Sequence, residues 1–204
     1  VACVAGKYVE STGSSAETDC ILCGIGKYSH VVGSSTANDC LDCVAGKYLV
    51  AEGSAAETDC VPCGPGKYSI VAGSSAQSDC TDCAPGKYLQ ALGSDAETDC
   101  TLCGSGKYST GYGSTTQVDC IDCGLGTYAW SQGNDAEADC IHCVAGRFST
   151  VIGSSTQADC IACVAGKYVE STGSSAETDC ILCGIGKYSH VVGSSTANDC
   201  LDCV

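Results

Sequence analysis

The chain has 204 residues and a net charge of −15, and 21 of its residues are cysteine, whereas tryptophan and phenylalanine occur once each and methionine never. The acidic balance argues against nucleic acid, which calls for a basic surface, and against an anionic membrane surface. No apolar run approaches the length of a membrane-spanning helix, and cysteine at this density is typical of disulfide scaffolds in oxidising, extracellular compartments.

One motif organises the chain from its first cysteine onward. The motif is C-x2-G-K-Y-x4-G-S-x4-D-C, first seen from Cys3 to Cys20, and it returns every 20 residues without an insertion or deletion. A fixed period this short predicts a quasi-one-dimensional array in which each repeat meets only its neighbours. The predicted repeats are residues 3–22, 23–42, 43–62, 63–82, 83–102, 103–122, 123–142, 143–162, 163–182 and 183–202.

Each repeat is too small to fold on apolar burial alone. Ordering a repeat of this size costs roughly 30 kcal/mol, whereas one tyrosine and two or three aliphatic side chains return about 2 kcal/mol each when buried. We therefore expect a small disulfide-rich fold with little regular secondary structure, only short β pieces and turns. Stacking of such repeats predicts an elongated, solenoid-like rod.

The first repeat shows the elements that we expect in every repeat. A short extended piece should lie around residues 6–9, followed by a turn in which Gly13 supplies a positive φ. The run from Ser14 to Glu17 has capping-box spacing and predicts a single helical turn. Asp19 precedes the second cysteine and is expected to accept backbone N–H bonds in an Asx-type turn.

The repeats alternate in type. Odd repeats place an apolar residue after the aromatic, and even repeats place serine there; odd repeats also carry glutamate two residues before the recurring aspartate, where even repeats are neutral. This alternation predicts a structural period of 40 residues, with about half a turn of rotation per repeat. In addition, residues 162–204 reproduce residues 2–44 letter for letter, which favours a fibre, because identical segments recreate identical lateral contacts.

Three cysteine pairings fit the spacing. The pairing that we predict closes each repeat as one loop, which contributes about 3 kcal/mol per loop in the chain-entropy model. The alternatives pair the two cysteines of each C-x-x-C joint, or pair cysteines across repeats; zinc also fits, because C-x2-C-x16-C-x2-C is a zinc-ribbon spacing. The predicted bonds join Cys3 to Cys20, Cys23 to Cys40, Cys43 to Cys60, Cys63 to Cys80, Cys83 to Cys100, Cys103 to Cys120, Cys123 to Cys140, Cys143 to Cys160, Cys163 to Cys180 and Cys183 to Cys200.

The odd number of cysteines leaves Cys203 over, and its partner is expected outside this segment. The absence of an initiator methionine and of a signal peptide agrees with an interior segment of a longer chain.

The aromatic position is interpreted as structural, with each ring packing on a disulfide or on the next repeat. All nine basic residues share the preceding position, with Thr127 as the exception, and lysine beside recurring aspartate predicts a ladder of weak ion pairs. The aromatic residues are Tyr8, Tyr28, Tyr48, Tyr68, Tyr88, Tyr108, Tyr128, Phe148, Tyr168 and Tyr188.

No catalytic constellation is recognisable, so we do not expect an enzyme, and no cofactor is predicted. The carboxylates are spaced singly and form no calcium-loop motif, so no metal site is predicted. The Gly-Ser-Ser turns are candidates for O-linked glycosylation, at Ser14, Ser15, Ser34 and Ser35.

The pattern of Cys3, Gly6, Tyr8, Asp19, Cys20 and Cys23 resembles the cysteine-rich modules of ephrin receptors and tumour-necrosis-factor receptors. The resemblance recurs over the whole chain, and its uniform length is similar to long arrays in surface and flagellar-hair proteins of algae and other protists. It implies an extracellular or cell-surface location, one disulfide closing each loop, and a tyrosine ring packed beside it. We expect an extracellular structural filament, or the shaft of one, that self-associates with like chains; the alternative is a receptor or adhesin ectodomain that binds a protein or glycan.

Overall fold

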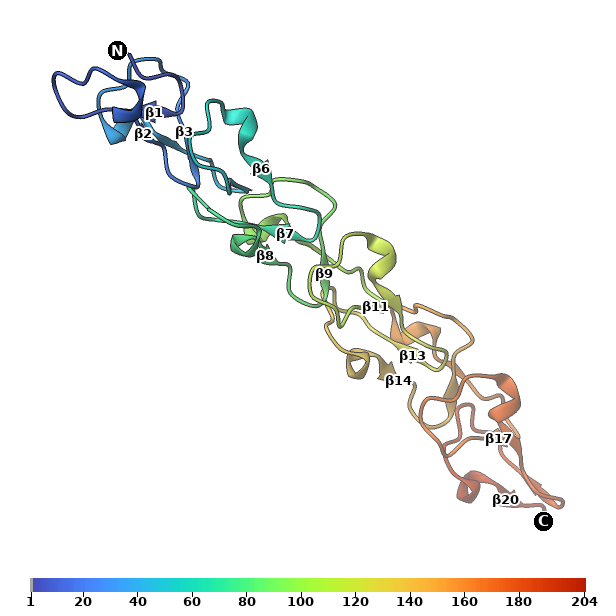
Figure 1. The fold of residues 1–204 in the computed structure, drawn as a ribbon. Helices are drawn as coiled ribbons and strands as arrows, with labels where there is room; N and C mark the ends of the chain where they lie inside the picture. The colour runs from blue at the N-terminus through green and yellow to red at the C-terminus, as the bar shows by residue number, and fades with distance from the viewer. Residues whose placement is uncertain (1) are drawn as a thin grey trace. The chain divides into compact units, whose positions relative to one another are not determined.

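A computed structural model describes residues 2–204 of the chain. Two compact units are present, and they interleave along the sequence: the first consists of the chain up to Cys83 with Leu89–Thr101 and Tyr112–Thr115, and the second of Ala84–Tyr88, Leu102–Gly111 and Thr116–Val204. Within each unit, two-residue strands and single helical turns are joined by long loops (Figure 1). The fold is therefore disulfide-rich, with short two-stranded pieces that repeat every 20 residues.

Every repeat contains two short strands and one turn of 3-10 helix. The strands that carry the aromatic residues are β1 (Lys7–Tyr8), β3 (Lys27–Tyr28), β5 (Lys47–Tyr48), β7 (Lys67–Tyr68), β9 (Lys87–Tyr88), β11 (Lys107–Tyr108), β13 (Thr127–Tyr128), β15 (Arg147–Phe148), β17 (Lys167–Tyr168) and β19 (Lys187–Tyr188). The strands in the C-x-x-C joints are β2 (Ile21–Leu22), β4 (Leu41–Asp42), β6 (Val61–Pro62), β8 (Thr81–Asp82), β10 (Thr101–Leu102), β12 (Ile121–Asp122), β14 (Ile141–His142), β16 (Ile161–Ala162), β18 (Ile181–Leu182) and β20 (Leu201–Asp202). The helical turns are η1 (Glu17–Asp19), η2 (Ala37–Asp39), η3 (Glu57–Asp59), η4 (Gln77–Asp79), η5 (Glu97–Asp99), η6 (Gln117–Asp119), η7 (Glu137–Asp139), η8 (Gln157–Asp159), η9 (Glu177–Asp179) and η10 (Ala197–Asp199).

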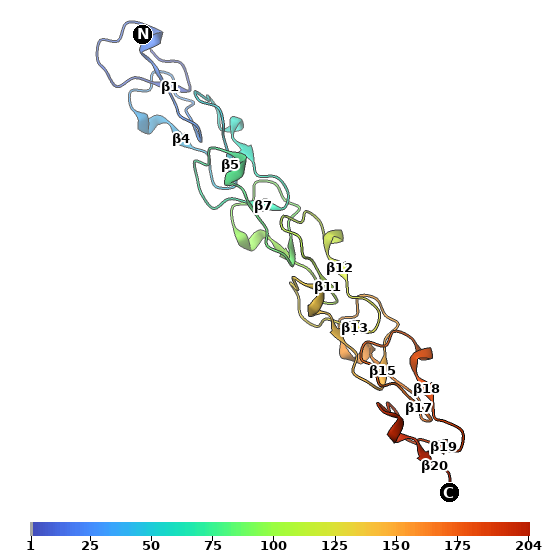
Figure 2. The same ribbon diagram turned by 60° about the horizontal axis from the view of Figure 1, so that its bottom comes forward.

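The two strands of a repeat pair antiparallel and close its loop. Lys7 lies opposite Leu22 and Tyr8 opposite Ile21, and the N–H of Cys23 donates to the carbonyl of Gly6. The same pairing joins β3 to β4, β5 to β6 and β7 to β8 in the first unit. In the second unit it joins β11 to β12 and β17 to β18, whose labels lie side by side in Figure 2.

The extended piece is shorter than the sequence predicts. Gly6 was expected to be extended, but it has a φ of +85° and belongs to the turn before β1, where Lys7 N–H donates to the Val4 carbonyl. The positive φ expected at Gly13 is present, at +79°. The invariant glycine that precedes the lysine is therefore a second left-handed position, which the sequence pattern alone did not distinguish from strand.

The helical turn begins later than the capping-box spacing predicts. It starts at Glu17, and Ala16 at the N-cap has no hydroxyl to cap it. Instead, the carboxylate of Asp19 accepts from the backbone N–H groups of Ser15 and Ala16, at 3.1 and 3.2 Å. Acceptance of backbone N–H bonds by Asp19 is confirmed, but the donors precede Asp19 in the chain, so it acts as the N3 residue of the helical turn and forms no Asx-type turn. The expected role of Ser14 and Glu17 as a capping pair is wrong.

The interior consists mainly of disulfides and of the residue after each aromatic. The first cysteine of each loop is fully buried in most repeats, and in the first unit Leu49 and Leu89 are buried as well. Even repeats bury serine at the same position: Ser29 is fully buried, and its Oγ lies 3.4 Å from that of Ser34. The alternation between apolar residue and serine therefore describes two versions of one buried position.

Each repeat is joined to the next repeat by backbone hydrogen bonds. In the first unit, Gly6 N–H donates to Ser29, Val9 N–H donates to Ser34, and Gly33 N–H donates back to Cys3. Tyr8 and Ser34 form a parallel bridge, and the same bridge recurs at later repeats of both units. A turn of one repeat thus completes the hydrogen bonding of the strand in the repeat before it.

Each repeat also meets the repeat two positions further on, which has the same parity. In the first unit, Gly53 lies over Gly6 and Gly73 lies over Gly26, so closely that a Cβ atom on the earlier glycine would overlap the later carbonyl. The corresponding contact in the second unit brings Gly153 to Gly106. Within each unit, odd turns therefore contact odd repeats, and even turns contact even repeats.

Candidate functional site

The joints between consecutive repeats are the chemically distinctive part of the molecule. Each disulfide spans 17 residues and closes one loop, so the two cysteines of a C-x-x-C joint bond in opposite directions along the chain. The pairing in the structure is the within-loop pairing. The disulfides are Cys3–Cys20, Cys23–Cys40, Cys43–Cys60, Cys63–Cys80, Cys83–Cys100, Cys103–Cys120, Cys123–Cys140, Cys143–Cys160, Cys163–Cys180 and Cys183–Cys200.

Cys203 is an exposed, free cysteine. The joint sulfurs in disulfides have no thiolate to offer a metal, because only the deprotonated thiol is a ligand. Among residues 2–204, no group of three or more histidine, cysteine and acidic side chains could hold a metal ion.

In four of the five even repeats, the aromatic ring packs on the disulfide of the next repeat. Tyr28 clusters with Cys43, Cys60 and the buried Leu49 in the first unit. Phe148 makes the equivalent cluster with Cys163, Cys180 and Val169 in the second. Tyr68 and Tyr108 are partly buried in the same environment. A ring and a disulfide from adjacent repeats thus form one apolar contact across the joint that follows each of these even repeats.

The lysines form two kinds of ion pair, according to parity. In even repeats the lysine lies opposite an aspartate of the joint strand, as with Lys27 and Asp42, whose Nζ and Oδ1 are 2.6 Å apart. In odd repeats the opposite residue is apolar, and Lys7 reaches Glu17 on η1 at 3.1 Å instead. The expected lysine ladder therefore exists, but its partners are not the aspartates before each second cysteine, which bind backbone N–H groups.

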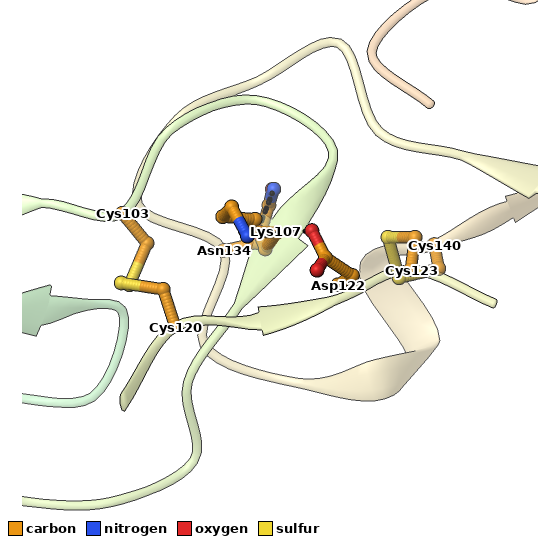
Figure 3. A network of polar contacts seen from close by, with 7 residues as sticks. All are labelled: Cys103, Lys107, Cys120, Asp122, Cys123, Asn134 and Cys140. Atoms are coloured by element: carbon orange, nitrogen blue, oxygen red, sulfur yellow. Dashed lines mark hydrogen bonds and ion pairs between the residues drawn. A yellow bond between two sulfur atoms is a disulfide. The ribbon is translucent and has the colours of Figure 1, made fainter. Parts of the chain in front are cut away.

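The even-repeat ion pair is best seen at Lys107. Figure 3 shows Lys107 beside Asp122, between the Cys103–Cys120 disulfide and the Cys123–Cys140 disulfide. Asn134 stands where the other repeats have serine, and its Nδ2 donates to the carbonyl of Lys107 at 3.0 Å. These pairs are partly exposed, so each contributes less than about 1 kcal/mol.

Two repeats depart from this pairing scheme. In the repeat 123–142 the lysine is replaced by Thr127, whose hydroxyl donates to the Gly124 carbonyl at 2.7 Å. In the repeat 143–162 the joint has Ala162 in place of aspartate, and the Nη1 of Arg147 donates to the Cys160 carbonyl at 2.8 Å. The basic position thus finds a partner within its own repeat even where the usual acid is absent.

The four candidate glycosylation serines have different environments. Ser15 and Ser35 are exposed. Ser34 is 2% exposed, and its hydroxyl donates to the Val31 carbonyl at 3.2 Å. Ser14 is half-buried and bonds to the Ser11 carbonyl. Burial contradicts the assignment of Ser34 as a sugar acceptor, because the buried hydroxyl is inaccessible to a transferase.

The surface hollows contain polar groups that already support the backbone. One hollow of about 660 Å³ in the second unit is lined by residues that include Glu170, Ser171, Ser174 and Asp179. Glu170 accepts the N–H of Ala197, Asp179 accepts the N–H groups of Ser175 and Ala176, and the two serine hydroxyls bond to each other. These contacts hold turns in place and do not assemble a nucleophile with a base.

The sequence analysis did not recognise the packing role of two recurring residues, a glycine and a serine. The glycine before each lysine was interpreted as strand, and the serine after each turn glycine, which recurs apart from Asn134, was interpreted as a helix cap or a sugar acceptor. The signal was present, because glycine in every repeat at a position where strand was expected indicates a positive φ or a close backbone approach.

Comparison with known proteins agrees with this architecture. The family model described as tyrosine-protein kinase ephrin type A/B receptor-like matches residues 6–60, 110–160 and 131–180, together more than half of the chain. No curated protein matches the sequence. Within residues 2–204, no helix has the length and apolar character to cross a membrane. Dense disulfides and receptor-like repeats both indicate an extracellular domain. The chain belongs to the ephrin-receptor-like family of cysteine-rich repeats.

Proposed function

We propose that the chain is an extracellular structural protein that forms a filament or the shaft of a filament at a cell surface. The observation that carries this proposal is the pattern of contacts within each unit. Each repeat is closed by its own disulfide and, where further repeats follow, is completed by the next two. Such contacts can continue for as many repeats as a chain contains, which is the behaviour of repeat arrays with nearest-neighbour interfaces.

The importance of these contacts is supported by a comparison of burial between two repeats that have the same sequence. Residues 23–42 and 183–202 have identical sequences. Within the structure, further repeats follow residues 23–42, whereas no complete repeat follows residues 183–202. Tyr28 is 9% exposed, whereas Tyr188 is 46% exposed, and Leu182 is also more exposed than Leu22. The following repeats, and not the local sequence, bury the apolar face of a repeat.

The parity of the contacts supports the proposed 40-residue period. Same-parity turns meet same-parity repeats, and the lysine partner changes between glutamate and aspartate with parity. In this arrangement the odd repeats within a unit form one column, and the even repeats within that unit form a second. The half-turn rotation per repeat and the repeat boundaries are part of the proposal.

O-linked glycans belong to the proposal at Ser15 and Ser35, whose side chains are exposed. Sugars at these positions would project from the residues next to the turns without disturbing the buried Ser34. Mass spectrometry of peptides from the secreted protein, before and after chemical removal of O-linked sugars, tests this assignment.

A binding module is the second candidate function, and one repeat favours it. In the repeat 123–142, a hollow of about 620 Å³ is lined by Leu125, Thr127, Glu137 and His142 among others. The substitution Thr127→Lys together with His142→Leu would restore the residues common in odd repeats. If the chain is a receptor or adhesin ectodomain that uses this hollow, the double variant loses binding to intact cells; a structural filament keeps its assembly.

Electron microscopy of the purified, secreted chain tests the proposed function. We expect elongated particles that assemble into fibres with a regular axial repeat as concentration rises. Compact particles that stay monomeric at all concentrations and salt conditions would contradict the filament and favour the binding module.

A further inference from the structure

Within residues 2–204, the odd turns expose three large apolar side chains, Val50, Leu92 and Trp130, whereas the even turns expose nine. In the first unit those of the even turns are Val31 and Val32, Ile70 and Val71, and Tyr112, with exposed fractions between 43% and 74%. In the second unit they are Val151 and Ile152, and Val191 and Val192, between 42% and 64% exposed. We call these residues the even-turn row of each unit.

The even turns are also free of charge. The segments 29–36, 69–76, 109–116, 149–156 and 189–196 contain no aspartate, glutamate, lysine or arginine. Each corresponding odd segment contains one acid: Glu10, Glu52, Asp95, Asp135 and Glu170. In a chain of net charge −15, the even-turn row is therefore the surface where a second acidic chain meets the least repulsion.

The remaining charges of the even repeats are already satisfied. In the repeat 23–42, Asp39 accepts the N–H of Ser35 and Asp42 pairs with Lys27. In the repeat 63–82, Asp79 and Asp82 have the equivalent partners. A neighbouring chain at the even turns thus meets carboxylates that are bonded within their own repeats.

The even turns are held in one conformation by buried serines. The hydroxyls of Ser69 and Ser74 lie 3.2 Å apart, and Ser74 Oγ donates to the Val71 carbonyl at 3.0 Å. Ser189, Ser194 and Val191 make the same contacts in the second unit. Because these hydroxyls occupy the interior, the valines are directed to solvent on a fixed backbone, which lowers the ordering cost of a contact there.

We propose that the even-turn row is the lateral self-association surface of the filament, and that its occupant is the even-turn row of a second copy of this chain. The proposal rests on the filament function and adds the surface that carries it. Apolar side chains of one row pack against those of the other, while the odd-turn acids Glu10 and Glu170 are bonded to the backbone N–H groups of Ala37 and Ala197. The identical pairs Val31–Val32 and Val191–Val192, eight repeats apart, allow one chain to meet another both in register and with a stagger of that length.

Two matched triple variants test the surface. The even variant carries Val32→Asp, Ile152→Asp and Val192→Asp; the odd variant carries Thr12→Asp, Gln132→Asp and Thr172→Asp. The substituted residues are exposed and occupy the same place in their turns, and both variants gain the same charge. Circular dichroism and the count of free thiols verify that both are folded.

Assembly is measured by sedimentation and electron microscopy over a range of concentrations, in 0.15 M and 1 M NaCl. We expect the even variant to need at least tenfold more protein to assemble than the unmodified chain, and the odd variant to change less than threefold. A benzophenone amino acid at position 32 should crosslink two chains through even turns. Equal effects of both triples, or a crosslink to odd turns, would overturn the inference while the filament function stands; failure of the unmodified chain to assemble would overturn the function itself.

Discussion

Gly26 lies directly beneath the carbonyl group of Gly73, two repeats further along the chain, and no side chain fits between them. Both glycines have a positive φ, of +78° and +74°. The contact lets the turn of one even repeat sit against the backbone of the preceding even repeat. A residue with only hydrogen as its side chain is therefore needed for the packing, in addition to the turn geometry.

Three glycine-to-alanine substitutions separate the requirement for a positive φ from the requirement for close packing without a side chain. Gly24 has an ordinary φ and open space around it; Gly186 has the positive φ but open space; Gly26 has the positive φ and the Gly73 contact. We expect Gly24→Ala to leave the free energy of local unfolding nearly unchanged and Gly186→Ala to lower it by about 1 kcal/mol, from left-handed strain. Gly26→Ala should lower it by more than Gly186→Ala, because the Gly73 turn must also move.

Hydrogen exchange of the affected repeats, followed by mass spectrometry, measures these differences locally. Gly26 and Gly186 lie in identical 20-residue sequences, so any difference between them comes from the following repeats. Equal destabilisation by Gly26→Ala and Gly186→Ala would show that the close approach to Gly73 does not contribute.

Tyrosine truncation tests the packing of rings on the next disulfide. Tyr28 packs on Cys43, Cys60 and Leu49, whereas Tyr188, which lies in an identical repeat sequence, is 46% exposed. Tyr28→Ala should lower the opening free energy of its repeat and the next by about 3 kcal/mol, as for a buried aromatic residue. Tyr188→Ala should cost less than about 1 kcal/mol. Faster amide exchange confined to residues 23–42 in the Tyr28 variant, with none in 43–62, would contradict the contact across the joint.

Removal of one disulfide should loosen its own loop and the loop before it. Replacing Cys43 and Cys60 together with alanine removes a crosslink over 17 residues, worth about 3 kcal/mol, and uncovers the ring of Tyr28. Limited proteolysis should then cut residues 43–60 first. The control, Cys203→Ser, changes an exposed free thiol and should leave the digestion pattern unchanged; equal resistance of the double variant would mean that stacking alone holds the loop.

The lysine ladder should contribute little to stability. Lys27→Gln removes the pair with Asp42, and Lys47→Gln removes the pair with Glu57 at 3.4 Å. Both pairs are partly exposed, so each variant should lower the free energy of unfolding by less than about 1 kcal/mol, and this loss should shrink as the salt concentration rises. Denaturant titration measures this, and a loss comparable to that of the Cys43/Cys60 double variant would refute the view that the ladder is secondary.

The regular spacing made much of the fold predictable. A repeat with one tyrosine, few aliphatic residues and two cysteines cannot bury enough surface alone, so crosslinks and neighbours had to supply the rest. Asp19 illustrates the local part of the prediction, because a carboxylate before the second cysteine has backbone N–H groups within reach. The parity of residues 9 and 29 was visible too, although it did not reveal that Ser29 is buried and Val9 half-buried.

Contacts between repeats were less predictable. Their partners lie far apart in the sequence, so the residues around one partner carry no information about the other. Nothing near Gly26 indicates that Gly73 will approach it, and nothing near Ser34 indicates that Tyr8 will pair with it. Lys27 shows the same limitation: several acids lie near in sequence, and only the antiparallel register places Asp42 opposite. The start of the helical turn was misplaced because the Asp19 carboxylate, and not the Ser14 hydroxyl, satisfies the free N–H groups.

The covalent closure of each repeat is the claim on which the other contacts depend, and peptide mapping of the non-reduced, secreted chain tests it most directly. Digestion and mass spectrometry should recover Cys3 linked to Cys20, Cys23 linked to Cys40, and so on through the array, with Cys203 outside these loops. Linkages between different repeats, or cysteines recovered as free thiols after removal of bound zinc, would contradict the account.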